Sequence, residues 1–336
     1  MMGLIQPYAN NHHNPSGPGD GRPTAIQIVE DQQLLGKWAG RVALVTGCSP
    51  GSIGAEIARA IHATGADVYI TSRDTTKGLV TAQSILADGN PGKVEVIQLD
   101  LTSLESVRKA AQTFLEKSQS LHLLINNAGV LGCPRQITGE GVDAHFAANY
   151  LGHFLLFQLL KASLLASTRD FEVRVVNVAS VAHRLGTYDL DDLAFEHRTY
   201  EASTAYAASK LATVHFANEV ERRFGAQGLH AFSVDPGITV TPLTKDTPEI
   251  VSMMDKYGAS DLRKSPEQGA ATPIWAAVAR ELKGKGGQYL EHCGETELCT
   301  EGGFLATGYG ENAYDQATEQ KLWIKSLGHV GMDEEK

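Results

Sequence analysis

From Arg41 onward, the chain alternates short apolar runs with longer amphipathic stretches. The runs are apolar rather than alternating with polar residues, which is typical of strands that helices cover on both faces. Seven runs are predicted strands: Val42–Thr46, Val68–Thr71, Val94–Leu99, Leu121–Asn126, Arg174–Val178, His230–Val234 and a run near Gln288–Leu290. Strands and helices that alternate in this way predict an α/β fold with a doubly wound parallel sheet.

The domain organisation follows from the length of 336 residues, which allows one large domain or two modest ones at roughly 100–200 residues per domain. No internal repeat or linker appears, so we predict a single Rossmann-type domain over residues 37–305 around a central, mostly seven-stranded parallel sheet. Residues 1–24 are rich in Gly, Pro and Asn, so residues 1–36 are expected to form a flexible N-terminal arm and lead-in. A C-terminal extension is expected over 306–336.

The charge balance argues against nucleic acid as a partner. Lys and Arg total 29 against 39 Asp and Glu, a formal net charge of −10, and no basic cluster could neutralise a run of phosphates. The cysteines are few and widely spaced, without zinc-ligand spacing: Cys48, Cys133, Cys293 and Cys299. They are interpreted as reduced thiols of a cytoplasmic protein, and no metal site is predicted.

The sequence predicts no membrane span and no targeting segment. The N-terminus lacks the basic and then apolar order of a signal peptide. The most apolar stretch, residues 151–165, is interrupted by His153, Gln158 and Lys161.

The first predicted strand runs into a glycine-rich loop, Thr46–Gly54, which is followed by a helical stretch. Glycines at such a turn let the backbone approach a pyrophosphate, whose charge then meets the N–H groups of the helix N-terminus. The loop residues predicted to bind a dinucleotide are Gly47, Ser49, Gly51, Ser52, Ile53 and Gly54.

The same loop contains a literal match to the G-x-S-x-G motif of serine hydrolases, at residues 47–51. In that motif the residue after the serine supplies a backbone N–H to the oxyanion hole, whereas Pro50 has none. The serine also follows the first strand, where the hydrolase motif follows several. A serine hydrolase is therefore kept only as a remote alternative.

The end of the second predicted strand bears on which nicotinamide cofactor the chain prefers. Arg73 precedes Asp74 there, about twenty residues beyond the glycine loop. An arginine at this place accommodates a 2′-phosphate, whereas an acidic residue binds the ribose 2′-hydroxyl. We favour NADPH, and Asp74 keeps NADH possible.

Tyr206 and Lys210 stand four residues apart in a stretch of helix formers, so they project from one helical face. A cation at that spacing favours the phenolate and is expected to lower the pKa of Tyr206 toward neutrality, which suits a proton donor. Ser180 follows the strand Arg174–Val178 at the carboxyl edge of the sheet, where ligands bind in this fold. Its hydroxyl could bond a carbonyl oxygen as charge develops.

In these motifs the sequence resembles the short-chain dehydrogenase/reductase family, in the family's order and across about residues 38–305. The matching residues are the Thr46–Gly54 loop, Asn126–Gly129, Asn149, Ser180, Tyr206 with Lys210, and Pro236–Gly237 followed by Thr241. The stretches Asn149–Phe154 and Ser180–His183, with the long interval to Tyr206, are most similar to the retinol dehydrogenase and WW-domain oxidoreductase branch.

The resemblance implies a catalytic set of four residues. Tyr206 would be the acid/base, and Lys210 would lower its pKa and hold the nicotinamide ribose. Ser180 would polarise the carbonyl, and Asn149 would support a water-linked proton path. The further cofactor-binding residues implied are Asp100 and Leu101 at the adenine, Asn127, Ala128 and Gly129 near the adenosine ribose, and Pro236, Gly237, Ile238 and Thr241 at the nicotinamide.

Two departures from the family pattern stand out. Ser52 is inserted before Ile53, so the glycine spacing is four and then three, and the part played by each glycine stays open. Ala179 replaces the first serine of the usual pair, which leaves Ser180 as the aligned hydroxyl.

The function expected from these residues is an NADPH-dependent carbonyl reductase or alcohol dehydrogenase. Its substrate would be a nonpolar ketone, aldehyde or secondary alcohol, for example a specialised metabolite, beneath a lid at about residues 238–266 that contains Ile250, Met253, Met254 and Tyr257. The alternative is an NADPH-binding scaffold or sensor without turnover. The resemblance leaves both a homodimer, paired through Asn149–Ala166 and Tyr206–Phe224, and a monomer open.

Overall fold

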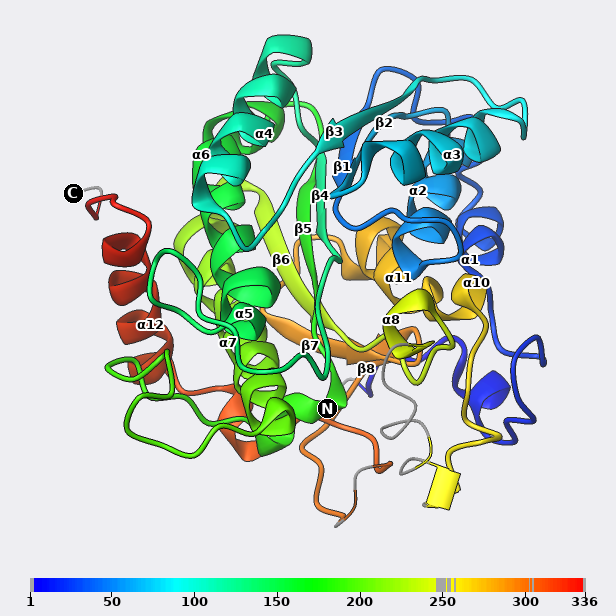
Figure 1. Cartoon of the computed structure of the whole chain (residues 1–336). Helices are drawn as coiled ribbons and strands as arrows, with labels where there is room; N and C mark the ends of the chain where they lie inside the picture. The colour runs from blue at the N-terminus through cyan, green and yellow to red at the C-terminus, as the bar shows by residue number, and fades with distance from the viewer. Residues whose placement is uncertain are drawn as a thin grey trace.

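The computed structural model describes residues 3–245, 252, 255–256, 258–301, 303 and 305–334. At its centre lies an eight-stranded sheet in the order β3-β2-β1-β4-β5-β6-β7-β8 (Figure 1). The strands are β1 (Val42–Val45), β2 (Asp67–Ser72), β3 (Val94–Gln98), β4 (Leu123–Asn126), β5 (Val173–Val178), β6 (Leu229–Val234), β7 (Gln288–Glu291) and β8 (Gly294–Glu295). Neighbours from β3 to β7 pair in parallel, and β8 pairs antiparallel with β7.

Two helical layers cover the two faces of this sheet (Figure 1). One layer holds α1 (Ala25–Asp31), α2 (Ile53–Ala63), α3 (Thr75–Leu86), α10 (Pro266–Gly269) and α11 (Ala271–Val278). The other holds α4 (Leu104–Lys117), α5 (Ala144–Phe146), α6 (Gly152–Ser167), α7 (Ala202–Phe224) and α12 (Gln316–His329). The helix α8 (Pro242–Lys245) follows β6, and short 3-10 turns lie at Ala9–His12, Val181–Leu185, Gly225–Gln227, Arg280–Leu282 and Glu311–Ala313.

The predicted doubly wound α/β fold is confirmed. All seven predicted strands are present and parallel, with ends that shift by one or two residues. Every residue of β5 and β6 is buried, as their apolar composition indicates for central strands. The strand β8 was not predicted, because two residues carry no periodicity.

The helices that follow β1, β2 and β3 begin at side chains that cap their first N–H groups. Ser52 caps α2, Asp74 caps α3 and Ser103 caps α4. Each cap lies just beyond the carboxyl end of a strand, so these helix N-termini gather along one edge of the sheet. That edge is where a doubly wound sheet binds its ligands.

The N-terminal segment, which was expected to be a flexible arm and lead-in, makes contacts with distant parts of the chain in the described residues. Ile28 and Val29 of α1 are fully buried, and the Ile5 N–H donates to Glu295 at 2.9 Å. Arg22 is only 4% exposed. The composition of residues 1–24 does not indicate these contacts, because they include hydrogen bonds to residues far away in the sequence.

The C-terminal segment contributes to the core through α12, which lies along α7 (Figure 1). The Trp323 ring lies 5.0 Å from that of Phe154 on α6 and 6.2 Å from that of Phe216 on α7. Trp323 is 4% exposed, so α12 buries aromatic surface that α6 and α7 present outward.

The helix that runs from Ala144 to Ser167 is long and apolar enough to cross a membrane by length and composition alone. In the structure, 72% of its most apolar window is buried inside the domain. Its apolar side chains therefore have a place in the protein core, as in the central helix of a folded domain.

Candidate active site

The glycine-rich loop joins β1 to α2, and its three glycines meet different surroundings. Gly47 has φ +75°, and a Cβ there would lie 2.8 Å from the Ala128 Cα. Gly51 has φ +72° and open space where a Cβ would point. A Cβ on Gly54 would lie 2.5 Å from the Asn127 Nδ2. Thus Gly47 makes the tight turn, Gly51 leaves the loop surface open, and Gly54 permits close packing of α2.

The extra residue Ser52 lies at the N-cap of α2. Its Oγ accepts from the Ala55 N–H at 3.2 Å and donates to the Gly47 carbonyl at 3.2 Å. The insertion therefore adds a cap and ties the two ends of the loop together, while the helix N-terminus still faces the loop.

The loop is braced from β4 by Asn127. Its Nδ2 donates to the Thr46 carbonyl at 2.8 Å, and its backbone N–H donates to the Thr46 Oγ1 at 2.9 Å. The Ala128 N–H donates to the same hydroxyl at 3.0 Å. Gly129 follows, and a Cβ there would lie 3.1 Å from the Asn149 Oδ1 and 3.7 Å from the Lys210 Nζ. The segment Asn127–Gly129 thus connects the glycine loop with the predicted catalytic residues.

The predicted adenosine-binding residues lie at the ends of β2 and β3. Arg73 is exposed, whereas the Asp74 Oδ1 accepts from the N–H groups of Thr76 at 2.9 Å and Lys77 at 3.3 Å. The Asp100 Oδ1 accepts from the Thr102 N–H at 2.9 Å, and Leu101 is buried at 6% exposure.

Tyr206 and Lys210 lie on one face of α7, opposite the carboxyl end of β5. The Lys210 Nζ lies 5.6 Å from the centre of the Tyr206 ring and donates to the Val178 carbonyl at 2.8 Å. Ser180 caps the turn after β5 by accepting from the Ala182 N–H at 3.2 Å, and its hydroxyl interacts with the Tyr206 phenol. The helical spacing and the strand end therefore bring these three side chains together as predicted.

Asn149 lies in a π turn, Ala147–Leu151, between α5 and α6. Its Oδ1 accepts from the Val130 N–H at 2.7 Å, and its Nδ2 donates to the Ser209 Oγ at 2.9 Å. Its backbone carbonyl is in contact with the His153 Nδ1 at 3.1 Å. The π turn thus fixes Asn149 beside the helix that carries Tyr206 and Lys210, a placement often seen at functional sites.

Burial dominates the electrostatics of the pair. Burial raises the pKa of Tyr206 to about 12, and the Ser180 hydrogen bond offsets this only in part. Burial also lowers the pKa of Lys210 to about 8, against a smaller opposing influence of Asp235. In this structure desolvation of the phenolate is thus the largest influence on the Tyr206 pKa, and the lowering predicted from Lys210 stays a prediction.

Two buried charged residues close to this site, Asp235 and Lys264, were not predicted from the sequence. Asp235 is 6% exposed, and its carboxylate accepts from the N–H groups of Val181 at 3.2 Å and Gly237 at 2.9 Å. Lys264 is 2% exposed, and a Cβ on Gly237 would lie 2.9 Å from its Nζ. Asp235 could have been found, because it directly precedes Pro236 at the end of a predicted strand. No sequence pattern around Lys264 indicates that this residue lies close to the site.

The residues predicted to lie at the nicotinamide, Pro236, Gly237 and Ile238, follow β6 after Asp235, with φ +79° at Gly237. Thr241 is buried at 6% exposure. The residues predicted to form the lid, Ile250, Met253, Met254 and Tyr257, lie outside the described residues.

The wall beside Tyr206 contains a polar cluster around His145. The Cys133 Sγ lies 3.3 Å from the His145 Nε2, and the Tyr200 hydroxyl donates to the Cys133 carbonyl at 2.8 Å. The His145 ring centre lies 6.4 Å from that of Tyr206. The described residues contain no group of three or more His, Cys, Asp or Glu side chains that could hold a metal ion.

His183 is expected to make the stability of the fold depend on pH in acid. Its Nδ1–H donates to the Ser180 carbonyl at 2.7 Å, while its Nε2 accepts from the Gly310 N–H at 3.0 Å. Burial lowers the pKa of His183 to about 4, below the unfolded value of about 6.5. The unfolded chain therefore binds more protons in this range, and the free energy of unfolding is expected to fall by roughly 3 kcal/mol between pH 6.5 and pH 4 from this group.

Urea unfolding of the His183→Gln variant between pH 7 and pH 4.5 measures this contribution. The amide can keep both hydrogen bonds without titrating, so the variant should lose less stability in acid than the wild type. His197→Gln, at an exposed histidine, is the control and should follow the wild type. The same pH dependence in wild type and His183→Gln would contradict the assignment.

A doubly wound sheet with a glycine loop, a helix N-terminus and a Tyr–Lys–Ser–Asn cluster at its carboxyl edge defines a dinucleotide-dependent oxidoreductase. The family model "short chain dehydrogenase" matches residues 41–251. The chain belongs to this family, as predicted, and is an NAD(P)-dependent short-chain dehydrogenase/reductase. The serine hydrolase alternative is therefore wrong.

The similar proteins fit this assignment. "Short-chain dehydrogenase/reductase prx1" of Penicillium roqueforti is 44% identical over 325 residues, which cover 95% of this chain and 93% of that protein. "Retinol dehydrogenase 12" of Homo sapiens is 36% identical over 293 residues, 87% of each chain, which agrees with the predicted branch. The Pseudomonas aeruginosa RhlG/NADP active-site complex has a TM-score of 0.62 at 27% identity and covers 77% of this chain and 96% of that one.

Proposed function

We propose that this enzyme is an NADPH-dependent carbonyl reductase or alcohol dehydrogenase that acts on a nonpolar ketone, aldehyde or secondary alcohol. The observation that carries the proposal is the convergence of Tyr206, Ser180, Lys210 and Asn149 at the carboxyl edge of the sheet, joined to the glycine loop through Asn127–Gly129. A carbonyl beside Tyr206 and Ser180 would meet two hydroxyl donors.

The loop and the catalytic edge fit a nicotinamide dinucleotide. Gly51 leaves open space at the N-terminus of α2, where a pyrophosphate would meet the first N–H groups. Lys210 and Gly129 lie near each other at the catalytic end, where the nicotinamide ribose would lie. When bound, the nicotinamide would supply or accept the hydride.

The chain's own residues supply the proton and the orientation. Because the pKa of Tyr206 is raised to about 12, its hydroxyl carries a proton at neutral pH and can donate it to a developing alkoxide. Ser180 would hold the carbonyl oxygen by a second hydrogen bond. Lys210 keeps a positive charge near the phenol below its pKa of about 8, which stabilises the tyrosinate that proton donation leaves behind.

The preference for NADPH is supported by the hydrogen bonds that Asp74 already makes and by the exposure of Arg73, the two residues that follow β2. The Asp74 Oδ1 already caps α3, so it is less available to a ribose hydroxyl, whereas Arg73 is exposed. A similar structure, the Pseudomonas aeruginosa RhlG/NADP active-site complex, contains NADP. Both points favour a 2′-phosphate bound by Arg73.

Arg73→Ala should weaken NADPH binding by about 10- to 100-fold and change NADH binding little, since a charge-assisted hydrogen bond contributes roughly 1.5–3 kcal/mol. The measurement is the dissociation constant for each nucleotide. Lys77→Ala removes a nearby exposed cation in the first turn of α3 and serves as the control. Equal losses of NADPH and NADH in Arg73→Ala would count against the proposed preference.

A nonpolar substrate is supported by aromatic side chains near the site and by the relatives. Phe195 is 8% exposed, and its ring packs against Tyr200 at 5.3 Å on the side of the site that holds His145. Two similar proteins are named for apolar alcohols, retinol dehydrogenase 12 and polyprenol dehydrogenase.

A panel of ketones, aldehydes and secondary alcohols of graded polarity, assayed with both nucleotides, tests the proposed function. Turnover should be highest with apolar compounds and NADPH or NADP⁺. Tight nucleotide binding without turnover of any compound would favour the scaffold or sensor alternative.

We further propose that the enzyme works in the cytoplasm, which its four free cysteines support. A monomer is favoured over a homodimer. The homodimer expected from the family would pair through α6 and α7, and α12 packs against both of these helices.

A further inference from the structure

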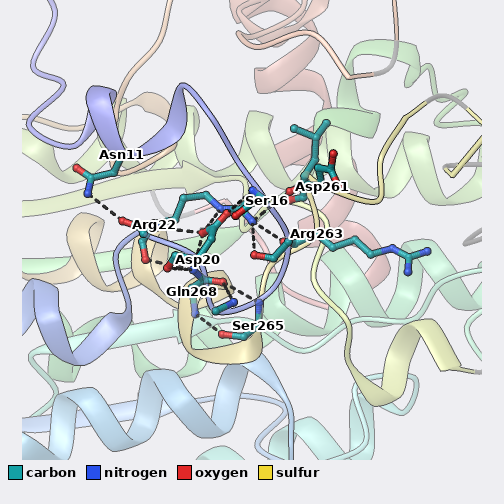
Figure 2. Close-up of polar contacts among 12 residues, drawn as sticks. Asn11, Ser16, Asp20, Arg22, Asp261, Arg263, Ser265 and Gln268 are labelled. Carbon is teal, nitrogen blue, oxygen red and sulfur yellow. Dashed lines mark hydrogen bonds and ion pairs between the residues drawn. The ribbon is translucent and has the colours of Figure 1, made fainter.

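The N-terminal segment makes a buried polar contact with residues 261–268, across the sequence from it (Figure 2). The Arg22 guanidinium donates to the carbonyls of Gly17 at 3.1 Å, Leu262 at 2.7 Å and Arg263 at 2.5 Å. Its Nε donates to the Asp20 Oδ1 at 2.8 Å. An arginine that is 4% exposed therefore uses its planar fork to hold the backbone of two segments.

Gln268 closes the same contact from the other side and is 1% exposed. Its Nε2 donates to the Asp20 Oδ1 at 3.0 Å and to the Arg22 carbonyl at 3.2 Å. Its Oε1 accepts from the N–H groups of Gly19 at 2.9 Å and Ser265 at 3.1 Å. We call Asp20, Arg22 and Gln268 the N-terminal clamp.

The backbone held by the clamp is hydrogen-bonded to residues 238–241, which we call the nicotinamide loop because Ile238 and Thr241 are predicted to lie at the nicotinamide. Lys264 follows Arg263, and its N–H donates to the Ile238 carbonyl at 2.7 Å. The Val240 N–H donates back to the Lys264 carbonyl at 3.3 Å. The Lys264 side chain then lies beneath Gly237, and its charge lowers the pKa of Asp235 against the effect of burial.

A second set of contacts connects the clamp with the nicotinamide loop. It passes through α10, which contains Gln268. A Cβ on Gly269 would lie 2.5 Å from the Thr239 Oγ1 and 3.2 Å from the Ile53 Cγ1. Thus α10 touches both the nicotinamide loop and the first residue of α2, beside the proposed pyrophosphate site. A shift of α10 could not leave these two regions in place, since the contacts are close-packed.

We propose that Arg22 is a positioning residue for the nicotinamide loop, and that the N-terminal clamp holds residues 238–241 in the geometry that binds the dinucleotide. This inference rests on the proposed function for its link to NADPH. The family match spans residues 41–251, so both halves of the clamp lie outside it.

The test compares Arg22→Met with Arg174→Met. Arg174 is 5% exposed and likewise donates to a carbonyl, that of Ala276 at 3.1 Å, and to a carboxylate, that of Glu172 at 2.7 Å. It lies at the start of β5, at the opposite edge of the sheet from the nicotinamide loop. Both variants lose a buried arginine, so a general loss of stability should affect them alike.

Two measurements are made on the full chain at a temperature where both variants are folded. Hydrogen exchange at the Val240 and Lys264 amides, without nucleotide, should be at least about 10-fold faster in Arg22→Met than in Arg174→Met. The NADPH dissociation constant should rise at least about 10-fold in Arg22→Met alone, because small displacements of binding groups are costly. Equal values in the two variants for both measurements would overturn the inference.

Asp20→Asn is the milder second variant, which removes the carboxylate charge beside Arg22 and keeps its shape. It should shift both measurements in the same direction by about 3-fold, and it decides the matter if Arg22→Met does not fold. Unchanged exchange and affinity in Asp20→Asn would then overturn the inference. A wild type that binds no nicotinamide nucleotide would refute the proposed function, while the exchange measurement would still decide whether Arg22 positions the loop.

Discussion

Tyr206→Phe is expected to lower kcat for any carbonyl or alcohol substrate by about 10²- to 10⁴-fold, the usual contribution of a general acid or base. The phenol is the proton donor in the proposed reaction, and its pKa of about 12 keeps it protonated across the working range. Phenylalanine keeps the ring that packs near His145 and removes only the hydroxyl. Steady-state kinetics and nucleotide affinity, measured together, separate the loss of chemistry from the loss of binding.

Tyr69→Phe is the matched control for this change. Tyr69 is fully buried in β2, and its hydroxyl donates to the Lys117 carbonyl at 3.4 Å, away from the catalytic edge. This variant should keep kcat within about 2-fold of the wild type, because the loss of a hydroxyl far from the active site acts mainly on stability. A Tyr206→Phe enzyme that turns over at the wild-type rate would refute the assigned role of the phenol.

Lys210→Met should cost about 10²-fold in kcat/KM. The Lys210 Nζ lies 5.6 Å from the Tyr206 ring centre, and at an effective dielectric constant near 20 a charge pair at that distance is worth about 3 kcal/mol. Methionine fills a similar volume without the charge, so the tyrosinate formed on proton donation loses its counter-ion. The buried position, 4% exposed, leaves little solvent to replace it.

The pH profile tests this role more sharply than the rate alone. Because burial lowers the pKa of Lys210 to about 8, the wild-type rate of carbonyl reduction should decline above about pH 8 as the charge is lost. Lys210→Met should lack that decline, and its low rate should be flat through the same range. A Lys210→Met profile that still falls near pH 8 would assign the titration to another group.

The core of the fold could be predicted because it depends on local patterns. The apolar runs of β5 and β6 and the helix-forming stretch around Tyr206 carry their periodicity in consecutive residues, and the structure follows them. The N-terminal segment could not be predicted in this way. Arg22 and Asp20 are charged residues among glycines and prolines, and their burial depends on carbonyls at residues 261–263.

In the candidate site too, local sequence patterns predict some features, while others depend on contacts between distant residues. The spacing of Tyr206 and Lys210 and the strand end at Ser180 predict that these residues meet, and they do. The sign of the Tyr206 pKa shift was not predictable, because it depends on how fully the fold removes water from the phenol. Lys264 was missed because only a long-range pairing with Ile238 brings it beneath Gly237.

Transfer of deuterium from NADPH that is labelled at both C4 positions tests the central claim most directly. The wild-type enzyme is incubated with an apolar carbonyl substrate, and the alcohol product is analysed by mass spectrometry. If Tyr206, Ser180, Lys210 and Asn149 serve hydride transfer, the label will appear on the carbinol carbon, and Tyr206→Phe will make correspondingly little labelled product. Product that forms at the wild-type rate without the label would contradict the account.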